Sequence, residues 1–127
     1  MVFSSNKEKG NTSLGMAIAY FTSQGYTVSI PLNDTQDYDL IVEKNNILQT
    51  VQVKSSACKN RNGNFQVALK SCGGTKGTTY KTFRQTNVDL LFIFLEDSSM
   101  YLIPSSKINN NSTITLSGKY KDYLSNF

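Results

Sequence analysis

The sequence contains no histidine and only two cysteines, Cys58 and Cys72, among its 127 residues. Because no histidine can join these thiols as metal ligands, reduced and unpaired cysteines are the favoured interpretation, with a disulfide or a partial zinc site as the alternatives. No hydrophobic run approaches the length of a membrane-spanning helix. The N-terminal residues also lack the apolar stretch of a secretory signal, so we expect a cytoplasmic protein.

Nucleotide-binding motifs are missing as well. Glycines gather in residues 71–79, but this segment lacks the Gly-Lys-Ser/Thr ending of a P-loop and the glycine spacing of the dinucleotide fingerprint. We expect it to be a loop, either a basic loop that orders on nucleic acid or a plain linker. No internal repeat is present, and a chain of 14.1 kDa predicts one domain over residues 1–127 with its own core.

Acidic residues are absent between Lys54 and Arg84, where seven of the 13 basic residues lie. Lysine and arginine neutralise phosphates and release counterions, so this basic run favours a nucleic-acid partner. The alternative is a solvated basic face with no partner. The candidate DNA contacts are Lys59, Arg61, Lys76, Lys81 and Arg84.

Hydrophobic periodicity predicts an α/β protein. Residues 11–24 have the apolar spacing of a helix, and Gly25 stands where a helix ends. Residues 119–127 place four apolar side chains on one helical face, either as core or as a subunit contact. Residues 88–95 are continuously apolar, as in a strand covered on both faces. Further strands are predicted at residues 26–30, 65–69, 100–103 and, at an edge, 114–116.

The central segment of the chain is predicted to form a hairpin. Its parts are a strand at residues 39–43, a turn at 44–46 and a strand at 48–54. Side chains alternate along a strand, so Gln52 and Lys54 share one face. If the side chain of Asp39 lies on that face too, one carboxylate, one amide and one ammonium converge at the strand ends.

An Asp at the start of one strand, followed in the next strand by Gln52-Val53-Lys54, resembles the PD-(D/E)XK nuclease superfamily, with Gln in the usual acidic place. The wider pattern is similar to the branch that includes group I intron-associated homing endonucleases and related bacterial and phage proteins. It consists of Lys9-Gly10, residues 25–31, residues 38–42 and residues 51–54, in this order. The resemblance implies a restriction-endonuclease-like core, with a mixed sheet of four to six strands flanked by helices.

The same resemblance implies metal-assisted hydrolysis of DNA. Asp39, the side chain of Gln52 and the backbone carbonyl of Val53 would bind Mg²⁺, for which Mn²⁺ can substitute, and Lys54 would act on the attacking water or on the developing charge. A helix in this superfamily often adds a Glu, but the matching place here falls near Leu14. Glu8 lies just upstream, as a substitute ligand or as a surface residue.

A homing or restriction-like endonuclease is therefore the leading hypothesis. The alternatives are a catalytically inactive DNA-binding module of the same fold, a Holliday-junction resolvase, and a structural or protein-interaction role. A chain this small offers little surface for a long recognition site or for two strands, so we expect a homo-oligomer, either a dimer or a tetramer.

Overall fold

The computed structural model describes residues 5–33, 35–69, 71–73, 79–81, 83, 86–109 and 112–127, with the backbone alone for 71–73 and 79–81. No helix in this described part is long and apolar enough to cross a membrane. The elements are, in order, α1 (Asn6–Ser23), β1 (Thr27–Ser29), β2 (Leu40–Lys44), β3 (Ile47–Ser56), β4 (Gln66–Ala68), β5 (Ser71–Gly73), β6 (Thr79–Lys81), β7 (Leu90–Leu95), β8 (Met100–Pro104), the 3-10 helix η2 (Ser105–Lys107), β9 (Thr113–Thr115), the 3-10 helix η3 (Gly118–Tyr123) and β10 (Leu124–Ser125).

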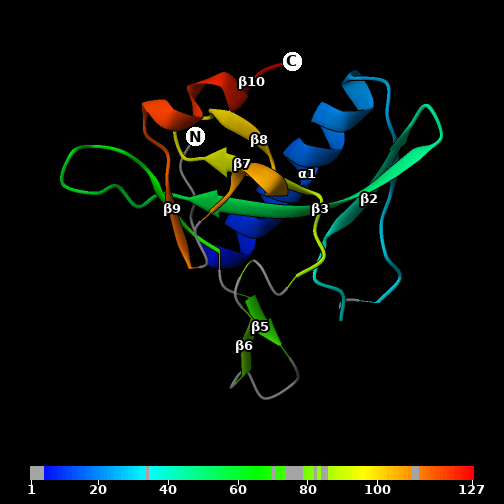
Figure 1. The fold of residues 1–127 in the computed structure, drawn as a ribbon, viewed down its shortest axis with the longest axis horizontal. Coiled ribbons are helices and arrows are strands. Elements are labelled where there is room, and N and C mark those ends of the chain that lie inside the picture. Colours follow the sequence, from blue (N-terminus) through cyan, green and yellow to red (C-terminus); the bar gives the residue numbers. More distant parts are fainter. Residues whose placement is uncertain are drawn as a thin grey trace.

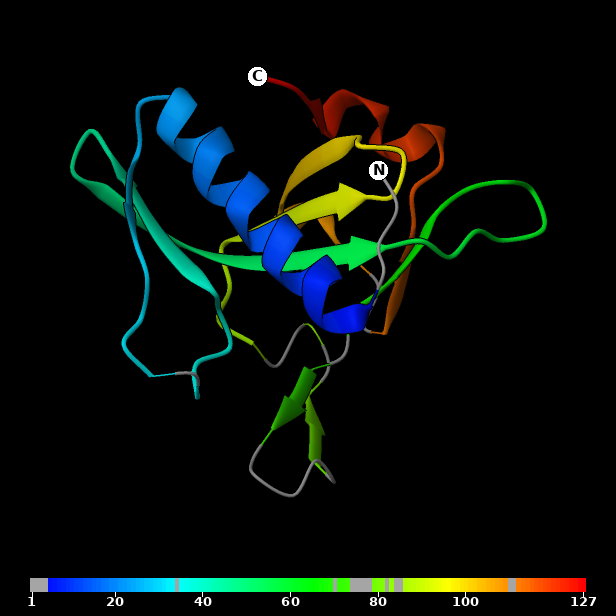
Figure 2. The ribbon, with the colours of Figure 1, turned by 180° about the vertical axis from the view of Figure 1, so that it is seen from behind.

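A mixed sheet of six strands, in the order β1-β2-β3-β7-β8-β10, forms the centre of the molecule (Figure 1). Strands β3 and β7 pair in parallel, and the other neighbouring pairs of this sheet are antiparallel. Helix α1 crosses one face of the sheet, as Figure 2 shows. The predicted architecture of a mixed sheet of four to six strands with the N-terminal helix on one face is confirmed.

Helix α1 begins five residues earlier than the apolar pattern predicts. Ser5 caps it, because its hydroxyl accepts a hydrogen bond from the backbone N–H of Glu8 at 3.1 Å. The predicted end is confirmed: Gly25 has φ +86°, and the N–H groups of Gly25 and Tyr26 donate to the carbonyls of Thr22 and Phe21. This is the bonding of a Schellman motif, which glycine favours at this position.

The β2–β3 hairpin is confirmed, and its turn explains its register. Asn45 and Asn46 both adopt positive φ, at 54° and 64°, as a two-residue type I′ turn requires. Lys44 therefore pairs with Ile47, and Leu40 pairs with Val51. Strand β3 is longer than predicted and continues to Ser56, beyond its last pair with β2 at Val51.

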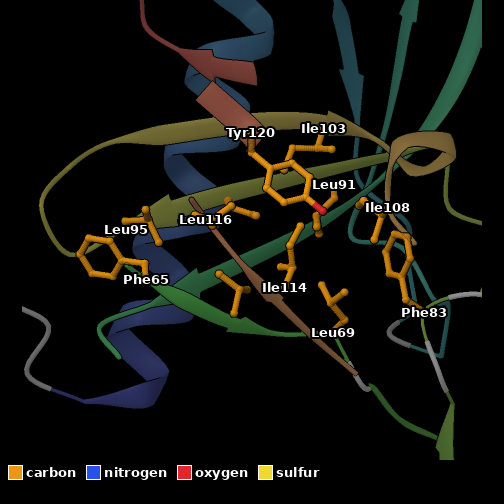
Figure 3. Packing of buried hydrophobic residues seen from close by; sticks show 12 residues of the cluster. Phe65, Leu69, Phe83, Leu91, Leu95, Ile103, Ile108, Ile114, Leu116 and Tyr120 are labelled. Atoms are coloured by element: carbon orange, nitrogen blue, oxygen red, sulfur yellow. The ribbon is translucent and has the colours of Figure 1, made fainter. Parts of the chain in front are cut away.

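Two hydrophobic clusters lie on opposite faces of β7, whose side chains are all buried. Leu90, Phe92 and Phe94 pack on the face that α1 covers. Leu91 and its odd-numbered neighbours pack against β4, β9 and η3 (Figure 3). The continuous apolar run is thus explained by a strand that is covered on both faces, as predicted.

Three local predictions need correction. Residues 71–73 are not loop, because β5 pairs with β6 in an antiparallel hairpin. The strand near Ile114 is β9, which pairs with β4 and not with an edge of the main sheet. The C-terminal helix ends at Tyr123, because the next two residues pair with β8 as β10. Tyr120 is core, but Leu124 and Phe127 are more than half exposed.

Tyr120→Phe tests the packing around η3. The Tyr120 side chain is 3% exposed, and its hydroxyl has no hydrogen-bond partner within the described residues. An unsatisfied buried hydroxyl costs about 1–3 kcal/mol, so its removal should leave the free energy of unfolding unchanged or raise it. Urea denaturation measures this, with Ile93→Val as a control expected to lose about 0.5–1.5 kcal/mol. A loss of stability in Tyr120→Phe would show that the hydroxyl is bonded.

Candidate functional site

The site lies along the part of β3 that extends beyond β2. Strand β2 pairs with β3 only as far as Val51, whereas β7 pairs with β3 from Val51 to Ser56. The edge of β3 that faces β2 is therefore available to other groups after Val51. The N-terminal half of α1 crosses near this part of β3 (Figure 2).

The carboxylate of Asp39 occupies this open edge. The backbone N–H of Asp39 donates to the carbonyl of Val51 at 2.8 Å, and the N–H of Val53 donates to Asp39 Oδ2 at 2.7 Å. The N–H and C=O groups of one strand residue point to the same edge, so the Val53 carbonyl also points to the side of Asp39. One carboxylate and one backbone carbonyl are thus brought together at the start of β2.

A pocket of about 150 Å³ adjoins these two groups. Its lining residues are Gly10, Ser13 and Leu14 from α1, together with Asp39, Val53 and Ser55. Leu14 therefore lies at the site, where the resemblance places it. Glu8 is exposed and is not one of the residues that line this pocket. Sequence reasoning missed Ser13 and Ser55; for Ser55 the alternation along β3 was an available signal, because it shares a face with Val53.

Gln52 and Lys54 lie on the face of β3 opposite to the side that packs on α1. The register pairs them with Leu91 and Ile93, whose side chains belong to the other cluster. Gln52 is 4% exposed, and its amide Nε2 donates to the carbonyl of Asp37 at 3.2 Å. Its Oε1 is buried and has no partner among the described residues. The predicted pairing of Gln52 and Lys54 on one face is found, while Asp39 lies at the strand edge.

Two opposing influences act on the Asp39 carboxyl group. The residue as a whole is exposed, but burial around the carboxylate raises the pKa of Asp39 above its usual value. The hydrogen bond from Val53 and the positive charge of Lys54 act in the opposite direction and are too weak to cancel this rise. Lys54 is half-buried and close enough to influence Asp39 electrostatically.

The predicted DNA contacts are distributed over two protruding segments. Lys59 and Arg61 are exposed beyond the end of β3. Lys59 Nζ lies 4.8 Å from the centre of the Phe65 ring. Lys81 belongs to β6 in the hairpin that protrudes on the side of the start of β2 (Figure 1). The side chain of Lys81 and all of Lys76 and Arg84 lie outside the described part of the structure.

A model of the PD-(D/E)XK endonuclease family matches residues 4–122. The chain belongs to this family. Its structure is similar to that of a bacterial homing endonuclease, I-Ssp6803I, with a TM-score of 0.74 and 26% sequence identity over 96% of this chain and 88% of that one. No curated protein sequence matches the chain. The restriction-endonuclease-like fold is confirmed, and the family and the structural neighbour together support an endonuclease.

Nucleases of this family generally use divalent metal ions. The described residues contain no group of three or more His, Cys, Asp or Glu side chains placed to hold one. Two oxygens at the open edge nevertheless suit a hard cation, the Asp39 carboxylate and the Val53 carbonyl, while the buried Oε1 of Gln52 lies on the face of β3 away from α1. The donor set therefore fits such an ion, with one carboxylate and otherwise neutral oxygens.

Asp39→Asn should reveal the raised pKa as a change in stability with pH. A carboxyl group whose pKa is higher in the folded than in the unfolded state stabilises the fold below its unfolded pKa of about 3.9, and loses that contribution as pH rises through the folded pKa. In the absence of metal, the neutral variant should melt at a higher temperature than the wild type at pH 7, and this gain should disappear in acid. Thermal melts at both pH values measure it.

Asp97→Asn is the matched control with the opposite sign. Burial acts to raise the pKa of Asp97, but hydrogen bonds from Ser99 and the charge of Lys59 outweigh it, so the pKa of Asp97 lies below its usual value. Its stabilising contribution is present at neutral pH and is lost as pH falls through the folded pKa, so this variant should melt lower than the wild type at pH 7. Equal destabilisation of the two variants at pH 7 would contradict the assignment for Asp39.

Proposed function

We propose that the protein is a metal-dependent DNA endonuclease that hydrolyses phosphodiester bonds, of the homing or restriction-like type. The single observation that carries the proposal is the meeting of the Asp39 carboxylate and the Val53 backbone at the open edge of β3, with Lys54 close enough to act on the carboxylate. The family match and the homing endonuclease neighbour support the same reaction class.

Each residue of the site then has a role in the chemistry. A divalent ion, Mg²⁺ or Mn²⁺, bound by the oxygens at this edge would polarise the phosphoryl oxygen and neutralise developing charge. Asp39 and the Val53 carbonyl would supply direct ligands, and the Gln52 amide oxygen a further one. The Lys54 ammonium would orient or deprotonate the attacking water, or stabilise the charge that develops at the phosphorus.

The basic run supplies the surface for DNA in this proposal. Lys59 and Arg61 are exposed on one segment beyond β3, and the β5–β6 hairpin carries Lys81. Phosphate contacts by such residues give affinity that does not depend on base sequence. Because both strands must be cut, we also propose a homo-oligomer with two-fold symmetry, which would present two of these sites to one duplex.

An inactive DNA-binding module is the second candidate function. Gln52 has an uncharged amide where the family motif usually has a carboxylate, and Leu14 adds no ligand from α1. In such a module Asp39 and Lys54 would form only an ion pair. A cleavage assay distinguishes the nuclease from the inactive module.

Lys54→Ala should abolish cleavage while DNA binding remains. The change removes the ammonium but leaves Asp39, the Val53 carbonyl and the basic surface, so the rate of the chemical step should fall by a factor on the order of a hundred or more. Asp39→Asn should have a similar effect, since an amide is a poorer ligand for Mg²⁺ than a carboxylate. The assay is cleavage of linear, supercoiled and four-way-junction DNA with Mg²⁺ or Mn²⁺ and with chelator.

Lys44→Ala is the matched control on the same hairpin. Its ammonium donates to the carbonyl of Gln24 at 2.9 Å and lies over the Tyr26 ring, at the C-terminal end of α1 and away from the site. It should lose some stability and keep its cleavage rate. Wild-type protein that binds DNA and cuts no substrate with either metal would favour the inactive module.

Neutralising Lys76, Lys81 and Arg84 together should weaken binding to a short mixed-sequence duplex and flatten its salt dependence. Each lost phosphate contact should reduce the slope of log K against log salt by about one unit. Exposed Lys119 and Lys121 on η3 provide the control, because η3 lies at the end of the molecule opposite the β5–β6 hairpin (Figure 1). Equal slopes for the wild type and the triple variant would show that these residues do not contact DNA.

A further inference from the structure

A second pocket, of about 160 Å³, is formed by the loop that connects β1 with β2. Its lining residues are Ile30, Pro31, Asn33, Gln36, Tyr38 and Asp39. Asp39 lines this pocket as well as the one beside α1, so a ligand here would adjoin the proposed metal position. None of the six lining residues is basic. The pocket therefore suits a neutral ligand better than a phosphate.

Hydrogen bonds hold the loop in shape. Near its end, Gln52 Nε2 donates to the carbonyl of Asp37 at 3.2 Å, which fixes the loop to β3. Within the loop, Gln36 Nε2 donates to Asn33 Oδ1 at 2.7 Å. The pocket is therefore formed before any ligand binds, as is usual for binding sites in proteins.

The bond between Gln36 and Asn33 orders two amides and leaves each with a group for a ligand. It uses one N–H of Gln36 and one lone pair of Asn33, so Gln36 Oε1 can still accept and Asn33 Nδ2 can still donate. Both side chains are exposed. In the major groove, adenine donates from its N6 amino group and accepts at N7, and a single Asn or Gln commonly bonds to both. The joined amides offer the same acceptor and donor.

The apolar part of the pocket matches the thymine of the same base pair. Ile30 is 61% exposed, and Pro31 next to it is half-buried. Thymine carries a methyl group in the major groove, which proteins recognise by apolar contact. A G·C pair has no such methyl group, and guanine O6 would place an acceptor against Gln36 Oε1. The loop also lies on the side from which the β5–β6 hairpin protrudes (Figures 1 and 2), so one duplex can reach both.

We propose that this pocket reads one A·T base pair in the major groove, with Gln36 and Asn33 bonding to adenine and Ile30 contacting the thymine methyl group. The inference rests on the proposed function, since it assumes that DNA lies across Asp39. Successive base pairs are about 3.4 Å apart, so the pair that is read should lie within about two base pairs of the cut. These residues determine specificity and take no part in the chemical step.

Selection of bound duplexes from a pool with randomised positions, without divalent metal, finds the preferred base pair without any need for cleavage. We expect the wild type to select A·T at one position, and G·C there to weaken binding on the order of ten- to a hundredfold. Gln36→Ala should lose this preference and keep the wild-type preferences elsewhere. Thr35→Ala is the matched control, because Thr35 is exposed beside Gln36 and is not one of the lining residues.

Base analogues in the selected duplex test the individual atoms. 7-Deazaadenine lacks the N7 acceptor, and uracil lacks the methyl group of thymine, while both still form the base pair. Each should weaken binding to the wild type by about three- to tenfold, measured by fluorescence anisotropy. In Asn33→Ala the donor to N7 is already gone, so 7-deazaadenine should have no further effect, whereas uracil should still weaken binding.

The possible failures are distinguishable. No selected A·T pair, or a preference that Gln36→Ala and Asn33→Ala leave unchanged, would overturn the base-reading pocket, while metal-dependent cleavage by the wild type would still support the nuclease. Additive effects of 7-deazaadenine and Asn33→Ala would overturn the bond between Asn33 and N7. Wild-type protein that neither binds nor cuts DNA would overturn the proposed function and the pocket with it.

Discussion

The parallel pairing of β3 with β7 is the interaction on which the site depends. It holds the half of β3 that β2 no longer accompanies, over the pairs from Val51 with Leu90 to Ser56 with Leu95. Asp89 stabilises the start of this pairing. Its carboxylate accepts hydrogen bonds from the backbone N–H of Thr50 at 2.9 Å and from the Thr50 hydroxyl at 3.2 Å. Because β7 is buried on both faces, this half of β3 has a fixed position while its other edge remains open to Asp39.

The same arrangement explains the electrostatic cost at the site. Within the β2–β3 ladder the backbone groups of β3 are already paired with β2. Asp39 precedes β2, and its carboxylate accepts a hydrogen bond from the N–H of Val53, which lies beyond the last β2–β3 pair. Burial raises its pKa, and a single hydrogen bond and one nearby ammonium do not cancel this effect. Functional sites often retain such groups at the expense of stability, because the unfavourable charge is the one that binds a cation.

Some elements could be predicted from the sequence, because interactions between neighbouring residues determine them. The Asn45-Asn46 turn, the end of α1 at Gly25 and the apolar strand β7 each follow from conformational preference or burial over a few residues. The start of α1 was missed, because its first residues carry no apolar pattern, Gly10 is a weak helix former and the cap at Ser5 lies outside the apolar stripe. The C-terminal stripe was misjudged, because pairing with β8 outweighs helical periodicity after Tyr123.

By itself, the sequence determined the hairpin, the alternation that groups Gln52 with Lys54, and the order of motifs shared with the endonuclease family. Only the tertiary structure decided that Asp39 bonds the backbone of Val53, that Leu14 and Ser55 line the same pocket, and that β4 pairs with β9. The physical reason is sequence separation. Alternation and turn preference act between neighbouring residues, whereas the meeting of α1 with the open edge of β3 depends on how the helix packs across the sheet, which no local pattern encodes.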